Sequence, residues 1–172
     1  MSSIRGLQTA TTLNTGILTG VALSLSSIGV SLALESPTTI TLLRQWSFLL
    51  RSSRLLFSAA VPVLLGLPYA FLAYTFRSAA STSTKAKLYL LSAALCLGPV
   101  PYGRLFMRET EEKLEGKAAA GLSVGAEAAE LKLQREETAK YLVDHWGILN
   151  LGRVVMVLGA GLVGLGASLV GR

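Results

Sequence analysis

The chain has 172 residues, enough for a single domain over residues 1–172, and carries a formal net charge of +6. Half of it is hydrophobic (51%) and only 15% is charged, whereas soluble domains carry about 25% charged residues. No charged residue occurs in 6–34, 55–76, 88–103 or 154–171. Because a spanning helix needs roughly 20 apolar residues, this pattern excludes a soluble domain. It predicts four membrane-spanning helices.

We therefore expect an all-α integral membrane four-helix bundle, with spans at about 13–34, 55–77, 86–107 and 146–171. The third charge-free stretch is the shortest, but Arg104 at its edge can extend towards the headgroups. The first stretch follows Arg5 and resembles a signal peptide, yet it exceeds the usual apolar core of 7–15 residues. We expect it to be retained as a span.

The positive charge by itself is compatible with nucleic-acid binding. Six of the basic residues instead flank predicted helix ends, where such residues anchor spans against lipid headgroups: Arg44, Arg51, Arg54, Arg77, Lys85 and Lys87. We therefore expect membrane lipid, and no nucleic acid, as a partner.

Cysteine and histidine each occur once, as Cys96 and His145. One cysteine allows no intramolecular disulfide, and one histidine excludes a multi-histidine metal site. We expect no protein-ligated metal.

In the first span, Gly16, Gly20 and Ser24 recur every four residues and form one stripe of small side chains. Small residues let helices pack closely in lipid, so the stripe predicts a packing face. The hydroxyls of Ser24, Ser26 and Ser27 are the alternative, as groups that face an interior cavity.

The first connection, residues 35–54, has helical periodicity, with Arg44, Arg51 and Arg54 largely opposite its apolar side. This predicts an amphipathic helix that lies in the interface or leads directly into the second span, with Trp46 at headgroup depth. Within the second span, Pro62 and Pro68 predict kinks.

The third span ends at Pro99 and Pro101, with Tyr102 at interface depth. A long third connection follows over residues 108–143, and its second half regains helical character and leads into the glycine-rich fourth span. Four spans put both termini on one side of the membrane, and the basic second connection favours the cytosol.

Trp146, Asn150 and Arg153 share one face of the fourth span. Buried polar groups are costly in lipid, so this face should point into the bundle and find partners. Two interpretations stay open for Arg153. Either it extends to the interface, or it is buried against an anionic ligand or one of four acids: Glu35, Glu109, Glu111 or Asp144.

His145 adjoins this face and is a candidate general base. The alternative is a structural histidine at the interface. Asp144 is its neighbour along the helix, and adjacent helical residues do not face each other. Asp144 is therefore not expected to orient the imidazole.

Several ordered motifs resemble the anthrone oxygenase family of small fungal four-span membrane proteins. They cover most of the chain and comprise Gly20, Ser24 and Ser26; Trp46; Pro62, Gly66 and Pro68; Pro101, Tyr102, Met107, Thr110 and Leu114; and Trp146, Asn150 and Arg153. One position departs from the pattern. Family members commonly carry Asn after Thr in the third-span exit, where this chain has Glu111.

The resemblance implies oxidation of a polyketide anthrone to an anthraquinone with O2 as co-substrate and no cofactor, in secondary-metabolite biosynthesis. It implies a catalytic base, for which His145 is our candidate, and anion stabilisation by Arg153 and Asn150. Tyr102 would donate a hydrogen bond. Trp46, Trp146, Ser24 and Met107 would contact the substrate.

On this basis we expect a multi-pass protein of the endoplasmic reticulum or another endomembrane, and a homo-oligomer stays open. The rival hypothesis is a non-enzymatic four-span scaffold or a carrier of a small lipophile. The two hypotheses differ in whether the protein accelerates anthrone oxidation.

Overall fold

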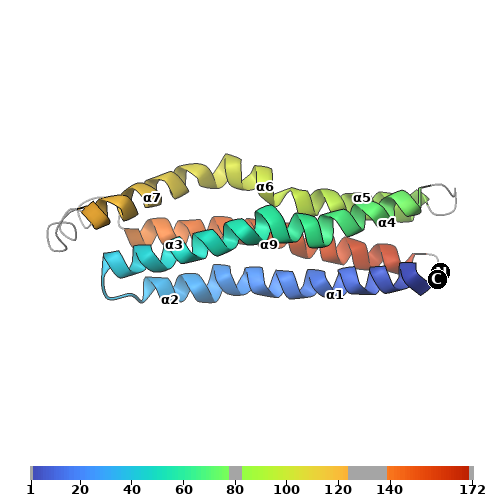
Figure 1. Ribbon diagram of the computed structural model, residues 1–172, viewed down its shortest axis with the longest axis horizontal. Coiled ribbons are helices and arrows are strands. Elements are labelled where there is room, and N and C mark those ends of the chain that lie inside the picture. The colour runs from blue at the N-terminus through green and yellow to red at the C-terminus, as the bar shows by residue number, and fades with distance from the viewer. Residues whose placement is uncertain (1, 78–82, 124–138, 171–172) are drawn as a thin grey trace.

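The computed structural model describes residues 2–77, 83–123 and 139–170. These residues form four long helical segments that are long and apolar enough to cross a membrane: Ser3–Leu34, Thr39–Thr75, Thr84–Ala119 and Ala139–Leu169. Among the described residues there is no strand. The predicted all-α membrane four-helix bundle is confirmed (Figure 1).

The first segment comprises α1 (Ser2–Ser24), a π-helical turn η1 (Leu25–Gly29) and α2 (Val30–Leu34). The second comprises α3 (Thr39–Leu55), two π-helical turns η2 (Leu56–Ala60) and η3 (Pro62–Gly66), and α4 (Leu67–Thr75). The third comprises α5 (Ser83–Leu97), α6 (Pro99–Tyr102), the π-helical turn η5 (Gly103–Met107) and α7 (Arg108–Ser123). The fourth is the single helix α9 (Ala139–Leu169).

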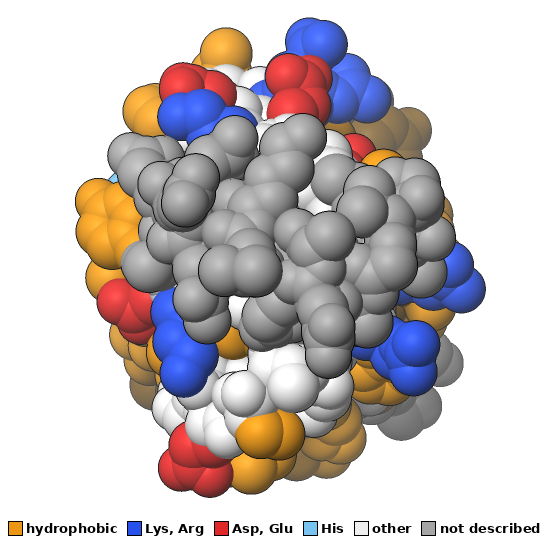
Figure 2. All heavy atoms as spheres, turned by 90° about the vertical axis from the view of Figure 1, so that its left-hand side faces the viewer, with side chains coloured by type: hydrophobic (Ala, Val, Ile, Leu, Met, Phe, Trp, Pro, Cys, Tyr) orange, Lys and Arg blue, Asp and Glu red, His pale blue; other side chains and the backbone are white. Residues whose placement is uncertain are grey.

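All four segments are longer than a bilayer requires. At 31 to 37 residues, they measure about 46–56 Å against a hydrocarbon core of about 30 Å. Figure 1 shows that α2, α3, α7 and the start of α9 meet at one end of the bundle. Figure 2 looks onto this end and shows basic and acidic side chains around its rim. Both chain termini lie at the other end, as predicted (Figure 1).

The amphipathic connection is helix α3, and it continues directly into the second span. Thr38 caps its start by accepting a hydrogen bond from the Thr41 backbone N–H. The apolar face faces the bundle rather than lipid: Leu42, Leu43, Trp46, Leu49 and Leu50 are all buried. This face packs against α2, α7 and α9, so Trp46 points into the bundle. Its headgroup depth stays a prediction.

The predicted packing stripe of the first span is also corrected. Gly16, Gly20 and Ser24 are exposed, and no neighbouring atom lies within 4 Å of a β-carbon added at Gly16 or Gly20. The buried face of this segment is rotated away and runs through hydroxyls and small apolar groups: Thr11, Thr15, Thr19, Ala22, Ser26, Val30 and Ala33. Thr hydroxyls are accommodated there because Thr11 and Thr15 donate to carbonyl oxygens four residues earlier.

The prolines of the second segment lie at or next to π-helical turns. Pro62 begins η3 and Pro68 lies in the first turn of α4, so the second segment stays one helix (Figure 1). The third segment bends where Pro99 and Pro101 lie, at α6 (Figure 1). In the fourth segment, glycine permits close contact as expected: Gly152 lies against the Tyr102 ring and Gly164 against the Tyr69 ring.

The bundle interior contains two apolar clusters. One, around Val61, Leu65, Tyr69 and Val157, lies nearer the termini, and the other, around Trp46, Met107, Leu114 and Trp146, lies nearer the opposite end. Polar side chains from three helical segments meet in the same interior. They define the candidate site. The predicted helical character of residues 130–138 falls outside the described residues.

Candidate active site

A buried hydrogen-bond network links three of the four helical segments. The Asn150 amide donates from Nδ2 to Ser26 Oγ at 2.7 Å, and its Oδ1 accepts from Ser53 Oγ at 2.9 Å. Asn150 and Ser53 are fully buried, and Ser26 is 4% exposed. Buried amides and hydroxyls persist only when they are paired. Asn150 therefore holds η1, α3 and α9 in register.

Arg153 lies one helical turn from Asn150 and joins this network. Its Nη1 lies 3.3 Å from Asn150 Oδ1 and 3.4 Å from Ser53 Oγ. The residue is only 7% exposed. Of the two interpretations that the sequence allowed, the structure favours the buried one.

Among the described residues, the Arg153 guanidinium hydrogen-bonds only to neutral groups. Its carbon lies 5.5 Å from the centroid of the Phe57 ring, a cation–π contact. Its Nε is buried and has no hydrogen-bond partner among the residues that the structure describes. Within the described part of the chain, no carboxylate lies within ion-pair distance of it. A buried cation without a counter-ion is costly in an apolar bundle, and such residues are typical of functional sites.

Glu111 is the acid that the fold brings closest to this network, but it pairs with α3. Its Oε2 accepts from Arg54 Nη2 at 2.8 Å, and its Oε1 accepts from Trp146 Nε1 at 3.3 Å. Arg54 also contacts Glu115 Oε1 at 3.0 Å. The Glu111 side chain is 10% exposed and that of Arg54 is 50% exposed. This carboxylate therefore lies between the interior and the bundle surface.

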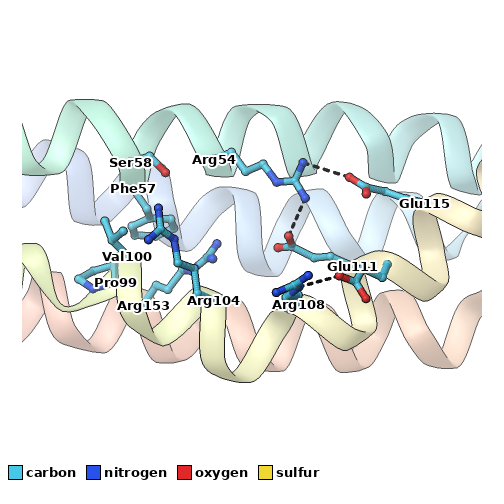
Figure 3. A pocket seen from close by; sticks show the side chains of 12 residues that line it. Arg54, Phe57, Ser58, Pro99, Val100, Arg104, Arg108, Glu111, Glu115 and Arg153 are labelled. Atoms are coloured by element: carbon cyan, nitrogen blue, oxygen red, sulfur yellow. Dashed lines mark hydrogen bonds and ion pairs between the residues drawn. The ribbon is translucent and has the colours of Figure 1, made fainter.

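A cavity of about 490 Å³ lies between these groups, within the range of about 300–1,000 Å³ typical of small-molecule sites. Figure 3 shows Arg153 beside Phe57, Pro99 and Val100, with Glu111 and Arg54 further along the same cavity. Its lining comprises Arg54, Phe57, Ser58, Pro99, Val100, Gly103, Arg104, Arg108, Glu111, Glu112, Glu115 and Arg153.

The local backbone explains why space is left here. Both walls carry a π-helical turn at this level, η2 on one side and η5 on the other. Such turns widen a helix locally and frequently occur at functional sites. Gly103 also gives the Arg153 guanidinium room, because an added β-carbon would overlap with it. The bend at α6 and the missing side chain at Gly103 together shape the cavity.

The structure brings some of the predicted site residues together. Asn150 and Arg153 lie side by side, and Arg153 lines the cavity. Trp46 and Trp146 contact each other edge-to-face at 6.2 Å between ring centroids, and both are fully buried. Met107 is buried in the same cluster. These three side chains lie behind the cavity and do not line it.

Three predicted residues lie apart from the cavity. His145 is exposed, with its ring stacked on Tyr141 at 6.1 Å. Ser24 is exposed, and Ser26 is the serine that reaches the network. The half-buried Tyr102 packs on Phe106 at 4.9 Å and against Gly152. His145 falls outside because residues adjacent on a helix point about 100° apart, and Trp146 takes the inward position.

Two residues of the site were not predicted from the sequence: Phe57, the aromatic wall of the cavity, and Ser53, a hydrogen-bond partner of Arg153. Phe57 belongs to a stretch that is typical of an ordinary membrane span, and Ser53 belongs to the polar residues just before that span. Glu111 was singled out only as a possible partner of Arg153 and as a departure from the family pattern. The signal that the sequence offers is Ser53 itself, a polar residue one turn before Phe57.

In the parts of the chain that the structure describes, no group of three or more His, Cys, Asp or Glu side chains is placed to hold a metal ion. The fold and the cavity thus define a polytopic membrane protein with a small-molecule-sized site that contains a buried arginine.

Comparison with known proteins gives the family. Residues 46–163 match the family model of anthrone oxygenase, and the chain belongs to this family. A curated relative, anthrone oxygenase encC of Aspergillus fumigatus, is 28% identical over 181 residues, which cover 98% of this chain and 96% of the relative. No solved structure matches the chain. The matched region contains Ser53, Phe57, Glu111, Asn150 and Arg153.

Proposed function

We propose that this protein oxidises a polyketide anthrone to the corresponding anthraquinone with O2, without a metal or an organic cofactor. The observation that carries the proposal is the buried Arg153 guanidinium, which lines a cavity of suitable size and has no carboxylate partner among the described residues. Family membership supports the same reaction.

The chemistry suits a site that stabilises an anion. Loss of a proton from the central CH2 of an anthrone leaves a carbanion whose charge is delocalised onto the carbonyl oxygen as an aromatic phenolate. The anion transfers electrons to O2, and a C–O bond forms to give a peroxide at that carbon. Loss of the second C–H proton and cleavage of the O–O bond then form the new carbonyl and release water. One oxygen atom enters the quinone and the other enters water.

Arg153 is placed to stabilise the phenolate and the peroxide. A fixed cation in a water-poor site stabilises developing negative charge without reorganising, an effect worth roughly 10²–10³ in rate. Asn150 and Ser53 hold the guanidinium in position through Nη1. The Phe57 ring supplies an aromatic wall for a flat tricycle.

Glu111 is the carboxylate that the geometry favours as proton acceptor, because it lines the cavity and is mostly buried. Its bonds to Arg54 and Trp146 fix its orientation. The assignment of His145 as the base stays a prediction, since its ring does not line this cavity. Trp46, Trp146, Met107 and Tyr102 act in this scheme as packing behind the site, and Ser24 has no place in it.

We place this reaction in fungal secondary-metabolite biosynthesis, in the endoplasmic reticulum or another endomembrane. The support is the fungal relative and a site built among membrane-spanning helices, which suits a lipophilic substrate.

The test uses membranes that contain the full chain, supplied with a panel of anthrones in air. We expect quinone formation faster than in control membranes, with one O2 consumed per quinone and no stimulation by added metal or flavin. Quinone formation at the control rate with every anthrone would overturn the proposal. Saturable anthrone binding without acceleration would instead support the carrier hypothesis.

The variant Arg153→Met tests the role of the buried guanidinium. We expect a loss of about hundredfold or more in rate with no loss of thermal stability, because an unpaired buried cation is replaced by an apolar side chain. Arg51→Gln is the matched control, since Arg51 is exposed on α3 and does not line the cavity. Full activity in Arg153→Met would contradict the role of the guanidinium.

A further inference from the structure

Acidic residues are confined to two parts of the chain. All ten occur at position 35 or within 109–144, so residues 1–34, 36–108 and 145–172 contain none. The fold brings the start of α1, the end of α4, the start of α5 and the end of α9 to the same end of the bundle (Figure 1). Basic residues in the described part of this end are Arg5, Arg77, Lys85 and Lys87.

The two ends therefore differ in electrostatics. At the opposite end basic and acidic side chains are interspersed (Figure 2), and Arg54 and Arg108 each have a carboxylate partner. At the end that holds the termini, no described Asp or Glu is available to pair with a cation. An anion bound there therefore meets no competing Asp or Glu side chain of the described residues.

A groove of about 370 Å³ lies between α4 and α5 at this cationic end. Three small side chains leave the space, and two cations stand at its outer end: the lining comprises Ala70, Ala73, Tyr74, Arg77, Ala86, Lys87 and Leu90. The Arg77 guanidinium lies over the Tyr74 ring, 4.2 Å from its centroid. That contact holds the charge beside the groove.

The polarity of the groove lining changes along the bundle axis. Arg77 lies seven residues beyond Ala70, in the turn just past the end of α4 at Thr75. Lys87 lies about one turn outside Leu90 on the antiparallel α5. The cations are therefore outermost, while the inner part is lined by alanine and leucine. This is the order of a phospholipid, with its phosphate at the surface and its acyl chain in the hydrocarbon.

We propose that this groove binds an anionic glycerophospholipid, with the phosphate between Arg77 and Lys87 and an acyl chain along Ala70, Ala86 and Leu90. Guanidinium and ammonium groups are strong donors to phosphate oxygens. The apolar inner part selects a lipid over a free phosphate, and the two positive charges favour an anionic lipid. The site is independent of the cavity at Arg153.

The alternative is general attraction of all four cations to an anionic surface, with no defined site. Lys85 distinguishes a defined site from this general attraction. It belongs to the same end and carries the same charge as Lys87, but it lies 5.6 Å from the Phe76 ring centroid and does not line the groove. A defined site depends on Lys87 and not on Lys85.

The experiment measures lipid binding to the purified, delipidated full chain by native mass spectrometry and thermal stability. The probes are dioleoyl phosphatidylserine, dioleoyl phosphatidylcholine and soluble glycerol 3-phosphate. We expect phosphatidylserine to bind and protect more strongly than the other two. Equal protection by phosphatidylcholine, or protection by glycerol 3-phosphate alone, would overturn the proposal.

Variants locate the site. Arg77→Gln and Lys87→Gln are each expected to weaken phosphatidylserine binding about fivefold, while Lys85→Gln leaves it within about twofold. Ala70→Phe fills the groove without changing charge and is expected to weaken binding as well; Ala70 is exposed, so the fold should tolerate the change. An effect of Lys85→Gln equal to that of Lys87→Gln, or an unchanged affinity in Ala70→Phe, would refute a defined groove site.

Discussion

The α-carbon of Gly103 packs directly on the guanidinium of Arg153, so that a β-carbon at position 103 would overlap with Nη2. This contact joins η5 of the third segment to α9. It fixes the position of the buried Arg153 guanidinium, the charged group in the network of Ser26, Ser53 and Asn150.

Gly103→Ala should therefore displace Arg153. We expect a loss of stability of about 1–3 kcal/mol from overpacking and a fall in anthrone oxidation. Thermal unfolding in detergent and quinone formation measure the two effects. Gly20→Ala is the control, because nothing lies within 4 Å of its added β-carbon and alanine favours helix by up to about 1 kcal/mol. Equal stability of Gly103→Ala and Gly20→Ala would contradict the contact.

Asn150→Ala removes the amide that ties Ser26, Ser53 and Arg153 together. We expect it to lower stability by about 1–3 kcal/mol, because the partners stay buried without their hydrogen bonds. Asn14→Ala is the matched control, since Asn14 is exposed on α1. Thermal unfolding of both variants is the measurement, and a similar effect of the two would show that the network contributes little.

Glu111→Gln keeps an acceptor for Trp146 and removes the carboxylate charge. If Glu111 accepts the substrate proton, the rate of anthrone oxidation should fall about hundredfold or more. Stability should change by less than about 1 kcal/mol, because Arg54 is half exposed and keeps Glu115. Glu109→Gln, at an exposed acid of α7 outside the cavity, should oxidise anthrones at the unaltered rate. An unaltered rate in Glu111→Gln would show that Glu111 is not the proton acceptor.

His145→Ala decides between the base predicted from sequence and the one favoured by geometry. His145 is exposed and contacts Tyr141, so the variant should fold. We expect it to consume anthrone at nearly the rate of the unaltered protein. A fall to the spontaneous rate would restore His145 as the base and would require the substrate to reach the outer face of α9.

Much of the fold follows from where charge is absent. Residues 6–34 and 154–171, for example, are long enough and free of charge, as lipid-embedded helices require. Helix ends were less predictable, because α3 and α7 are amphipathic and their sequences do not say whether the apolar face meets lipid or protein. In the structure they pack on α9, and the helices extend beyond a bilayer thickness.

The site was predictable in part for the same reason. Asn150 and Arg153 stood out as polar groups in an apolar span, and burial among other helices is their physical consequence. Their partners Ser26 and Ser53 lie more than 90 residues away along the chain. Pairings of that kind depend on helix rotation, which the sequence of one helix does not set.

The sequence alone thus determined that the protein lies in a bilayer, that it has four spanning helices and that the fourth has a polar face pointing inward. The reason is that transfer of charge into hydrocarbon is costly, so charged residues are excluded from lipid-facing positions. Only the tertiary structure decided which face of each helix points inward. It turned Gly16, Gly20, Ser24 and His145 outward. It paired Glu111 with Arg54 and left Arg153 beside the cavity with no described carboxylate within ion-pair distance. Those outcomes depend on how four helices rotate and bend against one another, and the wide turns at η2 and η5 settle that geometry.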